Sequence, residues 1–202
     1  MAETLIRRSP LQDYQSRFAA SPDSARVTEE PFVTMVDLWV DASGPGGAAA
    51  AGALGLPALP QAPSTLATAA DTTAIWFGPH EWLICAGDRP GESLESTLRQ
   101  AVTESGGAAV DVSAQRTTLR LQGVHARDVL AKGCSLDLHP RVFSPGTAAQ
   151  TMLGLAAAVL IPLDDTGSDY QLLVRSSFAR YVADWLLDAT EEFGVDTAGV
   201  SR

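Results

Sequence analysis

The sequence is poor in basic residues, with 14 Lys and Arg against 24 Asp and Glu, so its formal net charge is −10. A general nucleic-acid-binding protein needs Lys and Arg to neutralise phosphates, and this balance argues against that class. An acidic surface is more often a source of solubility than a signal for a basic partner.

Cysteines are also few. Cys85 and Cys134 lie far apart, form no Cys-x-x-Cys motif and have no histidine at metal-ligand spacing. A zinc site is therefore not expected. We interpret both cysteines as small core residues of a protein in a reducing compartment.

Long hydrophobic runs are missing as well. The most apolar stretch, residues 152–163, is interrupted by Gly154 and Pro162 and is too short to span a bilayer. The first residues hold two arginines without an apolar stretch after them, which is not the pattern of a secretory signal. The cytoplasm is the expected location.

What the sequence does contain is a hydrophobic fraction of 46% over 202 residues, enough for a packed core. The first half predicts the order strand, helix, strand, strand, helix, strand, which is the order of a ferredoxin-like unit. The predicted strands are residues 32–40, 74–77, 81–86 and 108–112, and the predicted helices are residues 43–56, weakened by glycine, and 92–105.

The second half repeats much of this order. GALGLPALP in the first half and KGCSLDLHP in the second each follow the short helix, which indicates an internal duplication. The predicted strands here are residues 117–122, 156–163 and 170–175, and the predicted helices are residues 124–132 and 177–193.

We therefore expect an α+β fold of two ferredoxin-like βαββαβ-type units. The expected division is an N-terminal arm over residues 1–30, a first unit over 31–113 and a second unit over 114–202. The arm should be extended, with a short helix around residues 11–18. It is ordered by a partner in one interpretation and simply frays in the other.

Aromatic residues gather around one turn, at Trp76, Phe77 and Trp82. Such clusters stack a flavin or a pterin in some proteins, but they more often close a core or anchor an interface. The neighbours His80 and Glu81 point to opposite faces if they continue a strand, so they are a poor acid/base pair. The other histidines, His125 and His139, are isolated.

Asp111 and Ser113 place a carboxylate and a hydroxyl on one face of a strand, without a histidine at a defined interval. Both side chains can bond local backbone, so a turn-stabilising pair is the favoured interpretation over a catalytic dyad. Arg175-Ser176-Ser177 predicts a helix cap, with an anion site at that helix start as the alternative.

The glycines do not form a phosphate loop. Gly44, Gly46 and Gly47 fail the G-x-G-x-x-G spacing, and the Walker pattern is absent. The sequence therefore predicts no catalytic, cofactor-binding or metal-binding residues, and it favours a binding or structural subunit over an enzyme that acts alone.

Several segments together resemble one family. VDVSAQRTTLRLQGVHARDVLAKGCSLDL (residues 110–138) resembles a segment shared by the glycine-cleavage T-protein and related folate-binding proteins. Residues 4–194 as a whole resemble the gamma subunit family of heterotetrameric sarcosine oxidase. The other segments that support this are IWFGPHEWLI (75–84), HPRVFSPGTAAQT (139–151) and VRSSFARYVADWLLDATEEFG (174–194).

This resemblance implies a T-protein-like fold and an assembly with alpha, beta and delta subunits. The assembly would demethylate sarcosine oxidatively to glycine, producing hydrogen peroxide and, with tetrahydrofolate as co-substrate, 5,10-methylenetetrahydrofolate. FAD, FMN and NAD would lie on the large subunits and zinc on the delta subunit. The gamma subunit would carry none of them and would pack on the alpha subunit's T-protein-like region.

The resemblance carries over no catalytic residue, because the catalytic aspartate of the T-protein lies outside the matched segment. Asp111 belongs to the matched scaffold strand. Candidate contacts to the alpha subunit are Trp76, Trp82, Arg116 and Arg141, since interface anchors are often Trp and Arg. The alternative function is an independent folate-binding one-carbon transferase or regulator, and an arm that clamps a neighbour would matter more for assembly than for stability.

Overall fold

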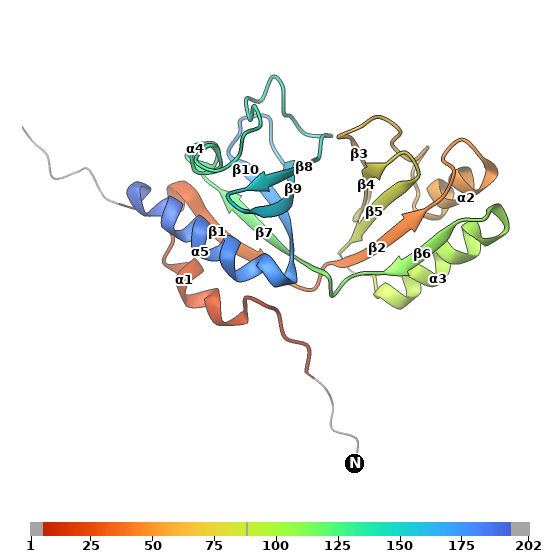
Figure 1. Cartoon of the computed structure of the whole chain (residues 1–202), viewed down its shortest axis with the longest axis horizontal. Helices are drawn as coiled ribbons and strands as arrows, with labels where there is room; N and C mark the ends of the chain where they lie inside the picture. The colour runs from red at the N-terminus through yellow and green to blue at the C-terminus, as the bar shows by residue number, and fades with distance from the viewer. Residues whose placement is uncertain (1–5, 88, 195–202) are drawn as a thin grey trace, which may run out of the picture.

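The computed structural model describes residues 6–87 and 89–194, whose strands form two five-stranded antiparallel sheets (Figure 1). The first sheet has the order β3-β4-β5-β2-β6, and the second sheet has the order β1-β7-β10-β9-β8. The first sheet comprises β2 (Thr34–Trp39), β3 (Leu66–Ala69), β4 (Thr72–Gly78), β5 (Glu81–Ala86) and β6 (Ala108–Asp111). The second comprises β1 (Arg26–Glu30), β7 (Arg116–Gln122), β8 (Ala149–Leu153), β9 (Ala156–Pro162) and β10 (Asp169–Arg175).

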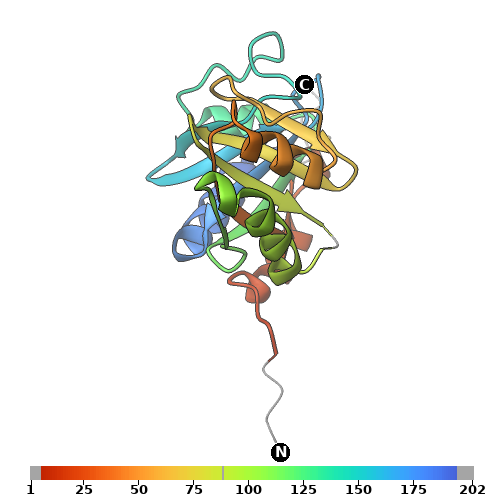
Figure 2. The ribbon, with the colours of Figure 1, turned by 90° about the vertical axis from the view of Figure 1, so that its right-hand side faces the viewer.

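Helices cover the outer face of each sheet, so the layers run helix, sheet, sheet, helix (Figures 1 and 2). α2 (Pro45–Ala53) and α3 (Gly91–Val102) cover the first sheet, and α1 (Gln15–Ala19), α4 (Ala126–Ala131) and α5 (Ala179–Thr190) cover the second. Short 3-10 turns lie at Gln12–Tyr14, Asp23–Ala25, Thr103–Ser105, Ser176–Phe178 and Glu191–Phe193. No helix in the described part of the chain is long and apolar enough to cross a membrane.

Alternation along the strands divides the hydrophobic residues into three clusters. In β2, Val36 and Leu38 pack under α2 and α3, whereas Met35 points to the inner face between the sheets. This is the period of two that places successive side chains on opposite faces of a sheet. The inner cluster joins both sheets and contains Met35, Ile75, Leu83, Ala148, Val159, Ile161 and Leu173.

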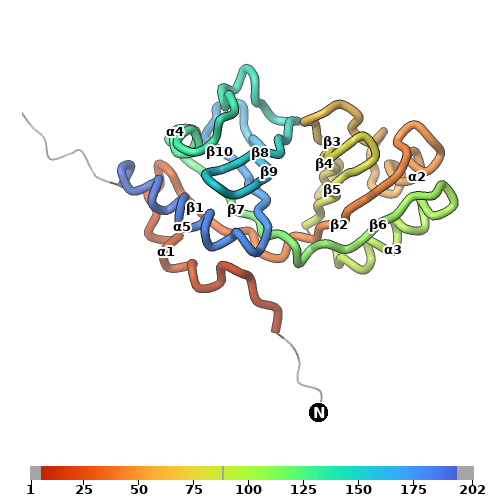
Figure 3. Tube along the Cα trace, viewed as in Figure 1, coloured from red at the N-terminus to blue at the C-terminus, as the bar shows by residue number. Residues whose placement is uncertain are grey.

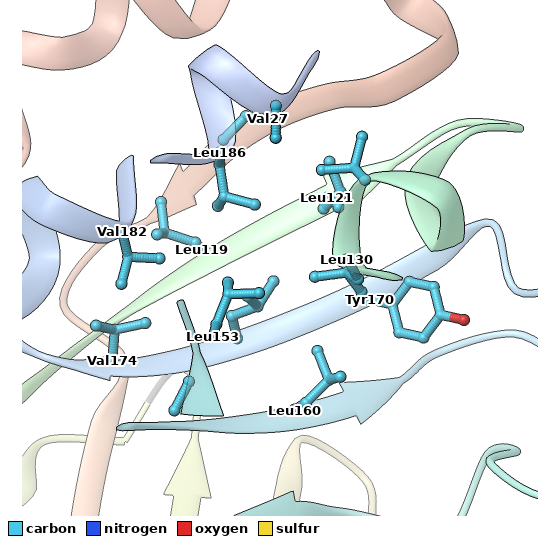
Figure 4. Packing of buried hydrophobic residues seen from close by; sticks show 14 of the residues in the cluster. Val27, Leu119, Leu121, Leu130, Leu153, Leu160, Tyr170, Val174, Val182 and Leu186 are labelled. Atoms are coloured by element: carbon cyan, nitrogen blue, oxygen red, sulfur yellow. The ribbon is translucent and has the colours of Figure 1, made fainter. Parts of the chain in front are cut away.

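The largest cluster lies between the second sheet and its helices (Figure 4). Leu119 and Leu121 from β7 meet Val182 and Leu186 from α5, and all four side chains are fully buried. Truncating one such buried leucine to alanine typically costs about 2–5 kcal/mol of folding free energy. This core holds the second sheet and its helices together as one body.

The chain crosses between the sheets twice, from β1 to β2 and from β6 to β7 (Figure 3). β1 therefore belongs to the second sheet, where it pairs with β7 from Arg26↔Gln122 to Glu30↔Thr118. The expectation of an extended arm over residues 1–30 is wrong for the described part of that segment. The predicted short helix is confirmed, but hydrophobic residues within it and after it enter the core: Leu11, Tyr14, Phe18, Ala25 and Val27.

Two further strands, β3 and β8, were not predicted. β3 has only half-buried and exposed residues, and β8 alternates with Gln150 and Met152 on the exposed side. Each forms a hairpin with the next strand, β4 or β9, and lies at a sheet edge. The other predicted strands and helices are confirmed, with ends that differ by a few residues.

Gly46 and Gly47 at the start of α2 have a packing reason. A Cβ on Gly47 would lie 2.5 Å from the carbonyl oxygen of Ala42, and one on Gly46 would lie 2.6 Å from the Ser105 side chain. Glycine lowers helix propensity, but here it lets the helix approach the end of β2 and the turn after α3.

The two similar segments of the sequence, residues 52–60 and 132–140, lie at corresponding places in the two halves of the fold, each at the end of a short helix. GALGLPALP starts in the last turn of α2, and KGCSLDLHP follows α4. Each supplies a carbonyl oxygen to a fully buried aromatic residue of the middle strand of its sheet. The Trp82 indole N–H on β5 donates to Pro60 O at 2.8 Å, and the Tyr170 hydroxyl on β10 donates to Leu138 O at 3.4 Å.

Candidate functional site

The aromatic cluster predicted around Trp76 does not form one site. Trp82 is 0% exposed and packs with Trp76 against the helix side of the first sheet, whereas Phe77 lies on the inner face. Because β-strand residues alternate between faces, neighbours in β4 separate in this way. Trp82 is therefore a core residue, and its candidacy as an interface anchor is wrong.

Each histidine has a local role. The carbonyl oxygen of His80 accepts a hydrogen bond from Val40 N at 3.1 Å in an exposed turn. The ring of His125 stacks on Phe193 with centroids 4.4 Å apart and pairs with Asp128 at 3.0 Å. His139 Nδ1 accepts from the backbone N–H of Arg141 at 3.1 Å.

Glu81 lies on the inner face of the first sheet, close to Asp37. Burial, with the Asp37 charge beside it, raises the pKa of Glu81 above its usual value. Asp37 is itself poorly paired, because its buried Oδ1 has no hydrogen-bond partner among the described residues. His80 is exposed and Glu81 half-buried, so nothing in this arrangement makes the two an acid/base pair.

Asp111 and Ser113 stabilise the crossing from β6 to β7. Asp111 Oδ1 accepts from the backbone N–H of Ser113 at 2.9 Å and from its hydroxyl at 2.5 Å. The same hydroxyl oxygen accepts from the backbone N–H of Met35 at 3.0 Å. The turn-stabilising role expected for this pair is confirmed, and it extends to the neighbouring strand β2.

Ser176 stabilises the same crossing from the other side. Its hydroxyl donates to Ala114 O and its backbone N–H donates to Gln115 O, both at 2.9 Å. No side chain caps the helical turn that starts at Ser176. The predicted helix cap at Arg175-Ser176-Ser177 is therefore wrong, because the Ser176 hydroxyl binds the crossing segment instead.

Arg116 begins β7 directly after this crossing. Its guanidinium lies over the Phe77 ring, 5.3 Å from the centroid. Burial, with Arg175 as a nearby like charge, lowers the pKa of Arg116 below its usual value. Of the candidate contact residues, Arg116 alone adjoins the inner face, whereas Arg141 lies exposed in the loop after α4.

Two surface grooves adjoin Arg116. One has a volume of about 480 Å³ and lies on the second sheet, where Arg116 and Arg175 stand beside Met152, Ala157, Val159 and Leu173. The other has a volume of about 380 Å³ and is lined by Arg7, Arg8, Phe32 and Ser113 as well as Arg116. Arg116 and Arg175 stand out separately in the sequence, but only the pairing of β7 with β10 makes them neighbours.

The Cys85 thiol is protonated at neutral pH. Burial raises the pKa of the Cys85 thiol to about 12, although the Arg116 charge acts in the opposite direction. Cys134 is buried in the core of the second sheet, as expected. Within residues 6–87 and 89–194, no three His, Cys, Asp or Glu residues gather in a way that could hold a metal ion.

Comparison with known proteins gives one consistent family. Residues 39–192 match the model of the family described as "Sarcosine oxidase, gamma subunit family". The chain is 36% identical over 199 residues to the sarcosine oxidase subunit gamma of Corynebacterium sp. (strain U-96), covering 94% of this chain and 93% of that protein. It is 36% identical over 197 residues to the subunit of the same name from Arthrobacter sp., covering 96% and 95%.

Solved structures agree with the sequence relatives. A chain of the heterotetrameric sarcosine oxidase from Corynebacterium sp. U-96, in complex with pyrrole 2-carboxylate, matches with a TM-score of 0.86 and 33% identity, covering 96% of this chain and 100% of that one. The glycine cleavage system aminomethyltransferase T from Bartonella henselae matches with a TM-score of 0.60 and 13% identity, covering 90% of this chain and 49% of that one. The second likeness is one of fold alone.

Proposed function

Because this chain belongs to the sarcosine oxidase gamma subunit family, we propose that it is a non-catalytic structural subunit of a sarcosine oxidase. The observation that carries this proposal is the likeness to a whole chain of a solved heterotetrameric sarcosine oxidase, which that match covers completely. Alpha, beta and delta subunits would be its partners, and its main contact would be with the alpha subunit's T-protein-like region.

The complex would oxidatively demethylate sarcosine to glycine, with hydrogen peroxide as the second product. With tetrahydrofolate, the one-carbon unit would leave as 5,10-methylenetetrahydrofolate. FAD, FMN and NAD would lie on the large subunits and zinc on the small delta subunit. This chain would supply shape and contact area for that assembly.

A structural role is supported by what the polar side chains of the most distinctive segment do. Asp111 and Ser113 hydrogen-bond at the crossing between the sheets. His125 stacks on Phe193 and bonds Asp128. Asp111, Ser113 and His125, which are candidate functional residues of segment 110–138, thus all make contacts that stabilise the fold.

The finer description of the fold belongs to the same proposal. We infer that each sheet with its outer helices is a ferredoxin-like unit with one edge strand added, β3 or β8. Without β3, residues 31–113 contribute four strands in the chain order β2, β4, β5 and β6. In the sheet they lie in the order β4-β5-β2-β6, so the first strand lies between the third and the fourth, as in a ferredoxin-like sheet. In the second sheet β9-β10-β7-β1 has the same arrangement, with β1 from the N-terminal segment in the fourth place.

Co-expression with the partner subunits tests the proposal. We expect a tagged form of this chain to co-purify with flavin-containing subunits, and the complex to oxidise sarcosine with release of hydrogen peroxide. The isolated chain should be colourless and inactive. Flavin bound to the isolated chain, or sarcosine oxidation by it, would contradict a non-catalytic role.

The alternative, an independent folate-binding protein, makes a different prediction for the isolated chain. Trp39 is 49% exposed on the inner face of the first sheet and gives a fluorescence signal for binding there. Under the proposed function, titration with tetrahydrofolate should leave this fluorescence unchanged apart from absorption by the titrant. Tight saturable quenching without partners would favour the alternative.

A further inference from the structure

We propose that the arginine-lined groove on the second sheet, continued through Arg116 to Arg7 and Arg8, binds an extended acidic segment of a partner subunit. This inference rests on the proposed function, because it assumes that partner subunits exist. It goes beyond it by naming the surface and the chemistry of what binds there.

The charge distribution is the first observation. The chain carries a net charge of −10, yet Arg7, Arg8, Arg116 and Arg175 line two adjoining grooves. Of the eight other arginines in the described part of the chain, five pair with carboxylates, such as Arg120 with Asp169 at 2.7 Å and Arg17 with Asp184 at 2.5 Å. The four groove arginines form no ion pair with any Asp or Glu of residues 6–87 and 89–194.

The position of two of these arginines is the second observation. Arg116 and Arg175 are directly opposite each other on the antiparallel strands β7 and β10. Like charges in this position destabilise a sheet. Burial and the Arg175 charge lower the pKa of Arg116, and the smaller effects of Asp37 and Glu81 in the opposite direction do not offset them. A carboxylate placed between the two guanidinium groups would turn this repulsion into two charge-assisted contacts.

The form of the groove favours a chain segment over a small molecule. Beyond the two arginines the groove combines polar side chains, Ser135, Gln150 and Thr151, with an apolar floor. There Val159 and Leu173 continue the inner core, and Met152 is 48% exposed. The groove of about 480 Å³ meets the second groove of about 380 Å³ at Arg116. An extended segment with acidic and apolar residues fits both the arginines and the floor.

The test compares two double variants in the reconstituted complex. Arg116→Gln/Arg175→Gln removes one half-buried and one exposed arginine from the groove. Arg127→Gln/Arg99→Gln is the matched control, because it removes one half-buried and one exposed arginine that line neither groove. Arg99 pairs with Glu95 on the surface of α3, where an exposed ion pair contributes little to stability. The Kd of each purified chain for the remaining subunits is measured at low and at high NaCl.

We expect the groove variant to raise Kd at least about tenfold at low salt and to flatten its dependence on salt, as charge complementarity requires. The control should change Kd by less than about twofold. In addition, Arg175→Gln alone should leave the melting temperature of the free chain unchanged or raise it, since it removes the repulsion with Arg116. A higher Kd for the partner subunits, together with an unchanged or higher melting temperature of the free chain, shows that the substitutions remove a contact with the partner and do not damage the fold.

Three results would overturn the inference. One is a groove variant that assembles like the control; another is a loss of affinity that does not depend on salt. The third is saturable binding of glutarate to the free wild-type chain together with normal assembly of the groove variant, which would assign the groove to a small dicarboxylate. If the wild-type chain itself does not join the flavin-containing subunits, the proposed function fails and this inference with it.

Discussion

Ser113 shows how a common local turn acquires a structural role from its surroundings. Asp111 and Ser113 form the same two hydrogen bonds as Asp41 and Ser43, an exposed pair with the same spacing. The difference is that the Ser113 hydroxyl oxygen also accepts from the backbone N–H of Met35, a residue with 0% exposure.

We predict that Ser113→Ala lowers the free energy of unfolding by about 1–3 kcal/mol, because the buried Met35 N–H loses its acceptor. Ser43→Ala, the matched control, should change it by less than about 0.5 kcal/mol, as is usual for a surface substitution. Urea denaturation of the isolated chain measures both. Equal effects of the two substitutions would show that the contact with Met35 contributes nothing beyond the turn.

The sequence could predict half of this arrangement. A Ser two residues after an Asp bonds local backbone in many turns, so the pair could be interpreted correctly from its spacing. The acceptor role toward Met35 depends on β2 and β6 lying side by side, and those strands are separated by two helices and three strands in the chain. The same holds for Arg116 and Arg175, whose pairing no local pattern encodes.

Strand β1 is the element whose role differs most from the prediction. Its sequence, RVTEE, has one apolar residue and three charged residues, so the sequence alone does not predict a strand there. The structure explains the charges: Glu30 pairs with Arg120 at 3.4 Å, and Thr117 donates to Glu29 at 2.7 Å. The strands with clear alternation were predictable, whereas β1, β3 and β8 are edge strands that need a neighbour to be recognised.

We therefore predict that deleting residues 1–30 abolishes the cooperative thermal unfolding of the isolated chain. The deletion removes a whole strand of the second sheet and the buried side chains of Leu11 and Phe18 from its core. Deleting residues 1–8 is the control and should lower the melting temperature by no more than a few degrees, because among residues 6–30 the core contacts begin at Leu11. Differential scanning calorimetry measures both; a cooperative transition in the longer deletion would restore the idea of a dispensable arm.

The molecule as a whole consists of two sheets with corresponding strand orders, but the chain supplies the strands differently. In the first sheet β6 follows α3 directly, whereas in the second the corresponding place is taken by β1, which comes from the other end of the chain. The end of the last helical turn nevertheless lies beside the entry to β1, since the Ser24 hydroxyl donates to Phe193 O at 3.2 Å. We therefore expect packing against β7, more than chain order, to decide where β1 lies.

A circular permutant tests this point. The new chain begins at Pro31 and carries residues 6–30 after residue 202 through a Gly/Ser linker of about 20 residues. α1 runs alongside α5, as the pairs Asp13–Arg180 and Arg17–Asp184 show, so the linker must return over the length of a 12-residue helix, about 18 Å. A flexible linker of this length has a typical end-to-end distance of about 25 Å and can do so.

We expect the permutant to keep the far-UV circular dichroism of the natural chain and a cooperative transition, with a melting temperature lower by several degrees because one crossing between the sheets is cut. The same permutant with Val27→Asp is the control, since Val27 is fully buried in the core of the second sheet and an unpaired carboxylate there prevents docking. If both permutants unfold alike, β1 does not reach its place beside β7 without its natural connection to β2. Chain order would then determine the second sheet, and the correspondence between the two sheets would be one of shape only.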